Sequence, residues 1–488
     1  MLMPIDYRPR AASTMPARGW SSTWTALCLC PLLPLLPNEV ALADGVRSPL
    51  EQSRPLRPGA PRPLEDYRFL DDPAKRDDPF DAFRYHRLSD SAWLQFGGEL
   101  RYRADSVDRP FFNLRGVGHE DYLQQRAQLH SDLHLLDGAM RVFVQLEDTR
   151  SWHKELRAPT DQSRSEIHQA FVDGNWGLGR AGNVTARVGR QEMAYGSSSF
   201  VSYRESPNLR YSFDGVHLSW AGPAGHKADV FAVRPVELRA DGSFNDGTDN
   251  AKTFYGLYAS LPLAPERGLD LYGFSLETSD RRLAGVFGDE KRHTLGARLF
   301  GKHQGWDWSW DLAGQVGHLG DARIRAWALS SDSGYTWDAE GRPRLGMRID
   351  MASGDDDPGD DRVGTFDPLF PRNQVYGEAS LTTLANAVVV GPTIGYSPHP
   401  RLRVEPAVLG VWKHKSADGV YFTGMNMAPG TAGTGKRAGT VYKTNLRWLV
   451  TPNLTVDLDG LFYDVGTAIT EAGGEDTAFL SVRGTFRF

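Results

Sequence analysis

Cysteine is almost absent from this sequence. The 488 residues contain two cysteines, Cys28 and Cys30, and both lie in a short apolar run near the N-terminus. Basic residues precede this run and a small-x-small site ending at Ala43 follows it, which is the order of a cleaved secretory signal. We therefore expect a signal peptide over residues 1–43 and a mature chain without thiols, suited to an oxidising periplasm. A lipoprotein anchored through Cys28 is the weaker alternative, because the residues before it are a poor approach to a lipidated cysteine.

Long apolar runs are also missing. No stretch of the expected mature chain approaches the ~20 apolar residues that a membrane helix requires. This excludes helical spans but leaves membrane-spanning strands open, because the polar face of such a strand cancels its apolar face in any running average of hydropathy. Aromatic residues are abundant by contrast, with 13 tryptophans, 17 tyrosines and 23 phenylalanines. The formal net charge of −6 is mild and identifies no ligand.

The final residues of the chain alternate apolar and polar side chains up to a terminal phenylalanine. Leu480, Val482 and Phe486 fall on one face of a strand, and Arg483 and Arg487 fall on the other. In a soluble protein the apolar face would pack on a core. In an outer-membrane barrel it contacts lipid, and the arginines line a watery lumen. A final strand that ends on an aromatic residue is typical of bacterial barrels.

The same alternation recurs from Trp93 onward, interrupted by turn-forming residues. About 18 or 19 segments approach the 9–11 residues of a tilted membrane strand, and single-chain barrels usually have an even number. We therefore expect an all-β fold, a single antiparallel transmembrane β-barrel of about 18 strands over residues 91–488, with a polar, arginine-rich lumen. Residues 44–90 are expected to form a proline-rich linker and a periplasmic lead-in or partial plug without clear secondary structure. A soluble β-sandwich or β-helix is the alternative, although no fixed repeat is visible.

The gaps between these segments alternate between short and long. The long ones are polar, and we expect them to form extracellular loops or constrictions folded into the lumen. They cover residues 104–120, 151–164, 236–251, 279–291, 354–373 and 414–437.

Basic residues are frequent on the phase that would face the lumen. Arginine forks match carboxylates and stay charged, so a ladder of them can form a pathway for polyanions. Acidic residues on the same phase, such as Asp132 and Asp350, could instead neutralise their neighbours and fill the lumen with ion pairs, and this alternative stays open. The basic residues on this phase are Arg101, Arg103, Arg126, Arg141, Arg187, Arg298, Arg323, Arg325, Arg348, Arg403, Lys443, Arg447, Arg483 and Arg487.

A dense acidic segment raises the question of a calcium site. Asp355, Asp357 and Asp360 supply the hard oxygen ligands that Ca²⁺ prefers, but their spacing does not match an EF-hand loop. A solvated loop is the preferred interpretation. His130 and His134 share one strand face but lie too far apart to chelate one ion comfortably. We expect no metal and no cofactor.

Longer motifs run through nearly all of the expected mature chain. They include Phe96-Gly97-Gly98-Glu99-Leu100-Arg101-Tyr102-Arg103, Val188-Gly189-Arg190-Gln191-Glu192-Met193-Ala194-Tyr195-Gly196, Arg204-Glu205-Ser206-Pro207-Asn208-Leu209-Arg210 and Thr365-Phe366-Asp367-Pro368-Leu369-Phe370-Pro371-Arg372. These motifs resemble the alginate-export family of outer-membrane β-barrels. The resemblance implies an 18-stranded barrel whose arginine-rich lumen passes an anionic polysaccharide outward, with loops acting as gates.

The resemblance also places particular residues near the constriction, as carboxylate partners or as structural partners. Pairing with nearby glutamates would make part of this set scaffold. Arg483 and Arg487 are expected at a wider end of the barrel. The arginines near the constriction are Arg101, Arg103, Arg190, Arg204 and Arg210, and the glutamates that would pair with them are Glu99, Glu192 and Glu205.

These observations predict an outer-membrane channel of a Gram-negative bacterium that passes an anionic, alginate-like polysaccharide or oligosaccharide. An uptake porin for small organic anions is the alternative. An outer-membrane hydrolase is less well supported, because Ser197-Ser198-Ser199 has no evident histidine partner in the sequence. The expected partners are an anionic saccharide or other organic anion, outer-membrane lipid and, for export, periplasmic components. Nucleic acid is not expected.

Overall fold

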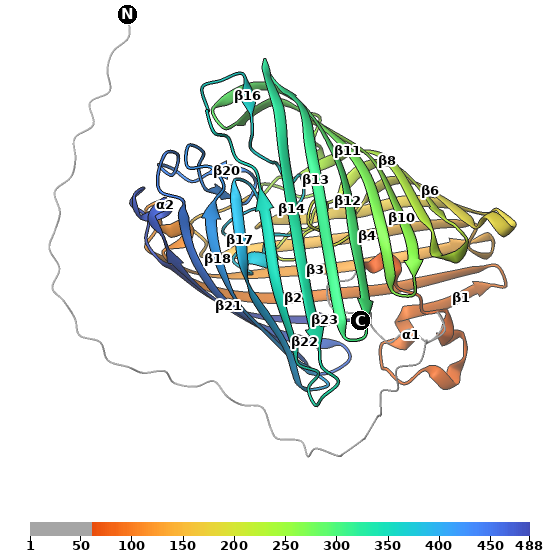
Figure 1. The fold of residues 1–488 in the computed structure, drawn as a ribbon. Coiled ribbons are helices and arrows are strands. Elements are labelled where there is room, and N and C mark those ends of the chain that lie inside the picture. The colour runs from red at the N-terminus through yellow and green to blue at the C-terminus, as the bar shows by residue number, and fades with distance from the viewer. Residues whose placement is uncertain (1–60) are drawn as a thin grey trace, which may run out of the picture. The chain divides into compact units, whose positions relative to one another are not determined.

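The first and last strands of the barrel pair with each other and close it. The computed structural model describes residues 61–488, so the expected signal peptide and the linker up to residue 60 lie outside the described residues. Eighteen antiparallel strands form the barrel, and β23 pairs with β2 to close it (Figure 1). The barrel strands are β2 (Ala92–Asp108), β3 (His119–Leu135), β4 (Met140–Trp152), β5 (Ser163–Gly177), β6 (Asn183–Gln191), β7 (Phe213–Ala221), β8 (Lys227–Glu237), β10 (Lys252–Ala264), β11 (Arg267–Leu283), β12 (Val286–His303), β13 (Trp306–Leu319), β14 (Ala322–Thr336), β15 (Arg344–Ala352), β17 (Ala387–His399), β18 (Leu402–Lys413), β21 (Arg437–Leu449), β22 (Leu454–Val465) and β23 (Thr477–Arg487).

The two-residue alternation decides which way each side chain faces. Leu100 and Tyr102 of β2 are exposed on the outer surface, whereas Arg101 and Arg103 between them are buried on the inside. Outward-facing tryptophans occur near both ends of the barrel, as expected for aromatic girdles at the two membrane interfaces. Trp176, Trp306 and Trp448 belong to the end with short turns, and Trp152 and Trp412 belong to the end with long loops. The expected barrel with an apolar outer face is therefore confirmed.

The remaining elements are short. No helix in the described part of the chain is long and apolar enough to cross a membrane. β9 pairs with β8 and β16 pairs with β14, while β19 and β20 form a separate two-stranded sheet. These elements are β9 (Gly247–Thr248), β16 (Arg362–Val363), β19 (Tyr421–Phe422), β20 (Asn426–Met427), α2 (Thr467–Thr470) and the 3-10 turns η4 (Pro110–Asn113), η5 (Leu136–Gly138), η6 (Gly179–Ala181), η7 (Pro223–Gly225) and η8 (Asn373–Tyr376).

The lead-in before the barrel is more structured than the sequence suggested. It contains η1 (Arg62–Leu64), η2 (Arg68–Asp71), η3 (Pro73–Lys75), α1 (Asp81–Arg84) and β1 (Tyr85–Ser89). β1 pairs with the first residues of β2, whereas β23 pairs with β2 only from Glu99 onward, so β1 covers the edge that β23 leaves free. Figure 1 shows β1 and α1 near the C-terminus at the end of the barrel with short turns.

A buried ion pair fixes the lead-in inside the barrel mouth. Arg62 is 1% exposed and lies 2.7 Å from Glu65, and its guanidinium also donates to the carbonyl oxygen of Gly98 on β2. Burial would raise the pKa of Glu65, but Arg62 and the nearby His130 hold it below its usual value. This mouth lies at the end of the barrel with short turns.

The loops at the opposite end differ from expectation at two places. Residues 279–291 are not a long loop, because β11 continues to Leu283 and β12 begins at Val286. The polar residues there belong to strands that run past the apolar part of the barrel. Conversely, the segment between β6 and β7 is a long irregular loop that the sequence did not reveal. We call residues 192–212 the inward loop, because contacts described below hold it inside the barrel.

The lumen is divided into an aromatic half and an open half. Phe213, Phe231, Phe254 and Phe274 project inward from neighbouring strands and are almost fully buried. Phe254 packs against Phe370 from the loop before β17, with ring centroids 5.1 Å apart. The side of the lumen lined by β7 to β11 is therefore filled by an apolar core. The sequence predicted a polar, arginine-rich lumen, and this side of the lumen is apolar instead.

Candidate functional site

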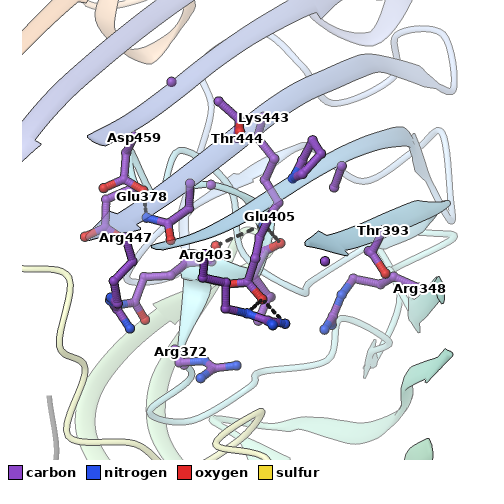
Figure 2. Close-up of a pocket in the computed structure, with 18 of the residues that line it drawn as sticks. Arg348, Arg372, Glu378, Thr393, Arg403, Glu405, Lys443, Thr444, Arg447 and Asp459 are labelled. Carbon is purple, nitrogen blue, oxygen red and sulfur yellow. Dashed lines mark hydrogen bonds and ion pairs between the residues drawn. The ribbon is translucent and has the colours of Figure 1, made fainter. Parts of the chain in front are cut away.

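The open half of the lumen contains a cavity of about 600 Å³. Its walls are inward-facing residues of β14 to β23 on one side, and the inward loop and residues 372–378 on the other. Figure 2 shows these side chains converging on the space. Seven basic and five acidic residues line it, which leaves an excess of positive charge. They are Arg344, Arg348, Arg372, Arg403, Lys443, Arg447 and Arg483, with Glu205, Asp332, Glu378, Glu405 and Asp459.

Two of these cations have no carboxylate partner among the described residues. Arg372 is exposed to the cavity and stands apart from the labelled acidic groups in Figure 2. The Lys443 ammonium donates instead to the backbone carbonyl of Val375, at 2.6 Å. A carbonyl oxygen satisfies a hydrogen bond but leaves the positive charge in place. These two groups therefore give the cavity its uncompensated positive charge.

Two further arginines are half-exposed and paired once. Arg403 lies 2.9 Å from Glu405, and Arg447 lies 2.7 Å from Asp457. Each guanidinium has five donor hydrogens and one carboxylate neighbour, so donors remain for a solute. Such exposed ion pairs are weak and exchange readily with water or an incoming anion.

The neighbouring arginines Arg344 and Arg348 are fixed by shared carboxylates. Both pair with Asp332, at 2.7 Å and 2.9 Å respectively. Arg348 also lies 3.1 Å from Asp350, and Arg344 lies 2.6 Å from Asp307. This network orients two cations along one wall of the cavity. It also partly neutralises them.

The arginines expected at the constriction have a different role, because they hold the inward loop. Arg101 is fully buried and donates to the backbone carbonyls of Glu205 and Pro207, at 3.0 Å and 2.9 Å. Arg103 donates to the carbonyl of Ser206 at 2.8 Å. Side chains without exposed surface cannot touch a solute in this conformation. They act as anchors between β2 and the loop.

Buried charge pairs reinforce these anchors. Arg126 lies 2.7 Å from Glu99 and also pairs with Glu205. Arg210, on the inward loop itself, pairs with Glu205 and lies 3.3 Å from Glu192. Burial would raise the pKa of Glu205, but Arg126 and Arg210 lower it to about 2. Glu205 therefore stays ionised and joins the loop to the wall.

Three predicted lumen arginines lie on the outward phase. Arg190 shares its strand face with the exposed Val188, pairs with Asp214 at 2.8 Å, and was wrongly expected in the pathway. Arg323 and Arg325 share their face with the exposed Trp327, so their inward assignment was also wrong. Arg190 was placed in the pathway by the family resemblance and not by alternation. For Arg323 and Arg325 the error comes from the strand pattern. Near the ends of long strands both faces are polar, so alternation no longer indicates which face is inside.

The other predicted residues are inside the barrel but mostly outside the cavity. Arg141 pairs with Asp132, Arg187 with Asp173, and Arg298 with Asp270, at 2.7, 2.7 and 2.9 Å. Arg483 was expected at a wide barrel end, but it lines the cavity and lies 2.6 Å from Glu378. Arg487 is buried 3.0 Å from Glu99.

Sequence reasoning missed three important cavity residues. Arg344 stands one residue before a recognised alternating segment, so extending that segment would have included it. Arg372 and Glu378 lie on a loop, where no periodicity indicates the direction of a side chain. Only the folding of that loop into the barrel brings Arg372 to the cavity.

The acidic segment and the serine cluster do not form sites. The described residues contain no group of three or more side chains that could hold a metal ion. Asp355 accepts hydrogen bonds from the amides of Asp357 and Gly364, so its oxygens stabilise the loop. Ser197 contacts Ser199, with the two Oγ atoms 2.7 Å apart, and no histidine of the described chain forms a hydrogen bond with it.

One serine, histidine and aspartate cluster does occur inside the barrel. The Ser219 hydroxyl donates to Asp229 at 2.5 Å. Ser219 and Asp229 both approach the same Nε2 atom of His217, at 3.3 Å and 3.0 Å. A catalytic relay needs the acid and the nucleophile on opposite ring nitrogens. This arrangement does not provide it.

A closed 18-strand barrel with a charged lumen cavity defines an outer-membrane β-barrel protein of the porin type. The family model for alginate export matches residues 92–483. The chain belongs to the alginate export family.

Solved structures with a similar fold are porins of low sequence identity. A BenF-like porin from Pseudomonas fluorescens Pf-5 has a TM-score of 0.56 at 11% identity, covering 81% of this chain and 99% of that one. Acinetobacter baumannii OccAB2 has a TM-score of 0.54 at 12% identity, covering 80% and 98%. Pseudomonas aeruginosa OccK2 (OpdF), solved in complex with glucuronate, has a TM-score of 0.53 at 12% identity, covering 80% and 98%. At these identities the similarity shows the fold alone. None of the curated proteins compared with the chain matches it.

Proposed function

We propose that this protein is an outer-membrane channel that passes a carboxylated, alginate-like polysaccharide or oligosaccharide through the cavity. The observation that carries the proposal is the pair of uncompensated cations, Arg372 and Lys443, which face water-accessible space inside a closed barrel. Half-exposed Arg403 and Arg447 extend this positive face along the wall. Arginine forks suit carboxylates, and several weak sites in series allow a polyanion to enter and leave.

Export is the proposed direction of transport. Membership of the alginate export family supports it. The proposal includes cleavage of a signal peptide at residue 43 and delivery of the polymer by periplasmic components. The inward loop and residues 372–378 border the cavity, so they are the proposed gates.

A bilayer recording tests the selectivity directly. The channel is reconstituted in a planar membrane under a salt gradient, and the reversal potential gives the ratio of anion to cation permeability. We expect an anion-selective wild type and a lower ratio in Arg372→Gln with Lys443→Gln. Each charge should contribute on the order of twofold, because a unit charge about 8 Å from an ion in a largely aqueous lumen contributes on the order of 0.5 kcal/mol.

Arg323→Gln with Arg325→Gln is the matched control, because it removes two exposed positive charges on the outer face that do not line the cavity. Cation selectivity of the wild type would contradict the proposal. An equal loss of selectivity in the control pair would show that the cavity cations have no special role.

An uptake porin for small organic anions is the second candidate. The solved structures of similar fold are porins, and one of them contains glucuronate, a small sugar acid. The two functions differ in the length of the preferred solute. An export channel should be blocked at lower concentrations by uronate oligomers than by the monomer, because an oligomer contacts several cations at once. Equal block per molecule would favour uptake of small anions.

A further inference from the structure

A second, smaller cavity lies nearer the end of the barrel with long loops. It has a volume of about 180 Å³ and is lined by Lys252, Thr278 and Arg281 near the long loops. The first cavity instead reaches Arg403 and Arg447, toward the short turns. The two cavities therefore lie at different depths of the same lumen.

A thin partition of two loop segments separates the cavities. One segment is residues 198–205 of the inward loop, and the other is residues 370–374. They are joined by hydrogen bonds, including one from the amide of Phe370 to the carbonyl of Phe200 at 2.9 Å. Because each segment is a single stretch of chain, it presents different side chains to the two cavities.

The lining residues show this division. Tyr203 and Glu205 line the first cavity, whereas Arg204 between them lines the second. In the other segment Arg372 lines the first cavity and Asn373 lines the second. Each cavity consequently has one arginine from the partition. Arg372 is exposed and Arg204 is buried.

Arg204 is held in an unusual position. It is 8% exposed, and its φ of 56° lies in the left-handed region that non-glycine residues seldom adopt. The Ser202 hydroxyl accepts a hydrogen bond from its amide at 2.9 Å. Its guanidinium donates to the Tyr211 hydroxyl at 2.7 Å and lies 4.9 Å from the centre of that ring.

No carboxylate among the described residues forms an ion pair with Arg204. The other charges of the second cavity are already paired. Lys252 lies 2.7 Å from Asp249, and Arg281 lies 2.9 Å from Asp367. Arg204 is therefore the uncompensated charge of this cavity. A buried charge without a partner is unfavourable unless an anion joins it.

We infer that the second cavity is an anion site, in which Arg204 binds the carboxylate of one sugar-acid residue before it leaves the channel. Tyr211, Leu369 and Phe370 supply apolar surface for the sugar ring, and Thr278 supplies a hydroxyl. A small pocket with a few placed polar groups and apolar walls has the composition of a ligand site. The identity of the sugar acid rests on the proposed function, whereas the anion site does not.

Block of single-channel current from each side tests this site. Glucuronate is added either on the long-loop side or on the short-turn side of the reconstituted full-length channel, with glucose as the neutral comparison and acetate as the carboxylate without a ring. In the wild type we expect glucuronate to block from the long-loop side more strongly than acetate, and glucose not to block. Arg204→Gln should raise the blocking concentration on that side roughly tenfold, because a charge-assisted hydrogen bond is lost. Block from the short-turn side should be unchanged.

Other variants separate binding from folding. Arg372→Gln should weaken block from the short-turn side instead. Tyr211→Phe removes the hydrogen bond between the Arg204 guanidinium and the Tyr211 hydroxyl but keeps the charge of Arg204, so block from the long-loop side should persist. Arg323→Gln, an exposed arginine on the outer face, is the matched control and should change neither. Each variant must first show the heat-modifiable gel mobility of a folded barrel.

Two results would overturn the inference, and a third would overturn the proposed function as well. Unchanged block in Arg204→Gln would show that this arginine only supports Tyr211. Block from the short-turn side alone, in an anion-selective channel, would remove the second site and leave the proposed function intact. A cation-selective channel with no block from either side would remove both.

Discussion

At the scale of single residues, burial separates two kinds of arginine in one lumen. Arg101 and Arg126 have no exposed surface, and their guanidinium groups donate hydrogen bonds to the inward loop and its carboxylates. Arg372 and Lys443 face the cavity without a carboxylate. The sequence left open whether the lumen arginines are scaffold or pathway. The structure shows which of them are buried and which face the cavity, and we propose a pathway role only for those that face the cavity.

Arg126→Ala should destabilise the barrel strongly. Its removal leaves the fully buried Glu99 without its nearest arginine and the partly exposed Glu205 without one of its two arginine partners, and breaking a buried pair typically costs ~3–5 kcal/mol. Urea unfolding followed by gel mobility measures the change. Arg403→Ala is the control, because its pair with Glu405 is half-exposed and should contribute ~0–1 kcal/mol. Equal effects of the two variants would contradict the anchor role.

The attachment of the inward loop through Glu205 should be insensitive to pH near neutrality. The pKa of Glu205 is lowered to about 2, so its charge contributes stability that is complete above the ordinary carboxyl pKa and is lost as the pH falls toward 2. We expect steady single-channel conductance above about pH 5 and increased current noise in acid. Glu205→Gln should show the acid behaviour at neutral pH, and Glu405→Gln should not. A wild-type transition near pH 7 that disappears in Glu205→Gln would rule this out.

At the scale of elements, the irregular segments position the site and the strands only support them. The inward loop and residues 370–374 create both cavities, and the lead-in fills part of the barrel mouth at the short-turn end through Arg62 and Glu65. Strands of a barrel give a rigid wall on which such segments can be anchored by side chains. Opening and closing of the channel should therefore depend more on the side chains that anchor these segments than on the barrel strands.

The lead-in can be released without opening the barrel. Arg62→Gln removes a buried guanidinium that lies 2.7 Å from Glu65, so the segment before β2 should become sensitive to trypsin while the barrel stays resistant. Digestion of detergent-solubilised protein, followed by mass spectrometry, locates the cuts. Arg68→Gln is the control, since its pair with Asp66 is partly exposed. Resistance of the Arg62 variant would show that β1 alone holds the segment.

The sequence predicted the strands well and the site poorly, for physical reasons. A strand such as β2 must present Leu100 to lipid and Arg101 to the interior, so its sequence alternates apolar and polar residues and can be recognised. Loops carry no such pattern, and Arg372 and Arg204 reach their cavities only after the loops fold inward. Charge pairing is also invisible before folding, since Glu205 and Arg101 lie on segments far apart in the chain.

At the scale of the whole molecule, the divided lumen places the proposed pathway along one wall of the barrel and away from its axis. The aromatic core around Phe231 and Phe254 fills the side lined by β7 to β11, and the open cavity lies against β14 to β23. A polymer would therefore pass along one wall and meet Arg372, Lys443, Arg403 and Arg447. The aromatic half acts as the support against which the partition is packed.

The central claim is that this wall passes carboxylated saccharides in preference to neutral ones. Its most direct measurement is the release of matched oligosaccharides from proteoliposomes, with a uronate oligomer and a neutral oligomer of the same length. The account predicts faster release of the uronate oligomer, and loss of that preference in Arg372→Gln with Lys443→Gln. Equal release of both oligomers, or faster release of the neutral one, by the wild-type channel would contradict it.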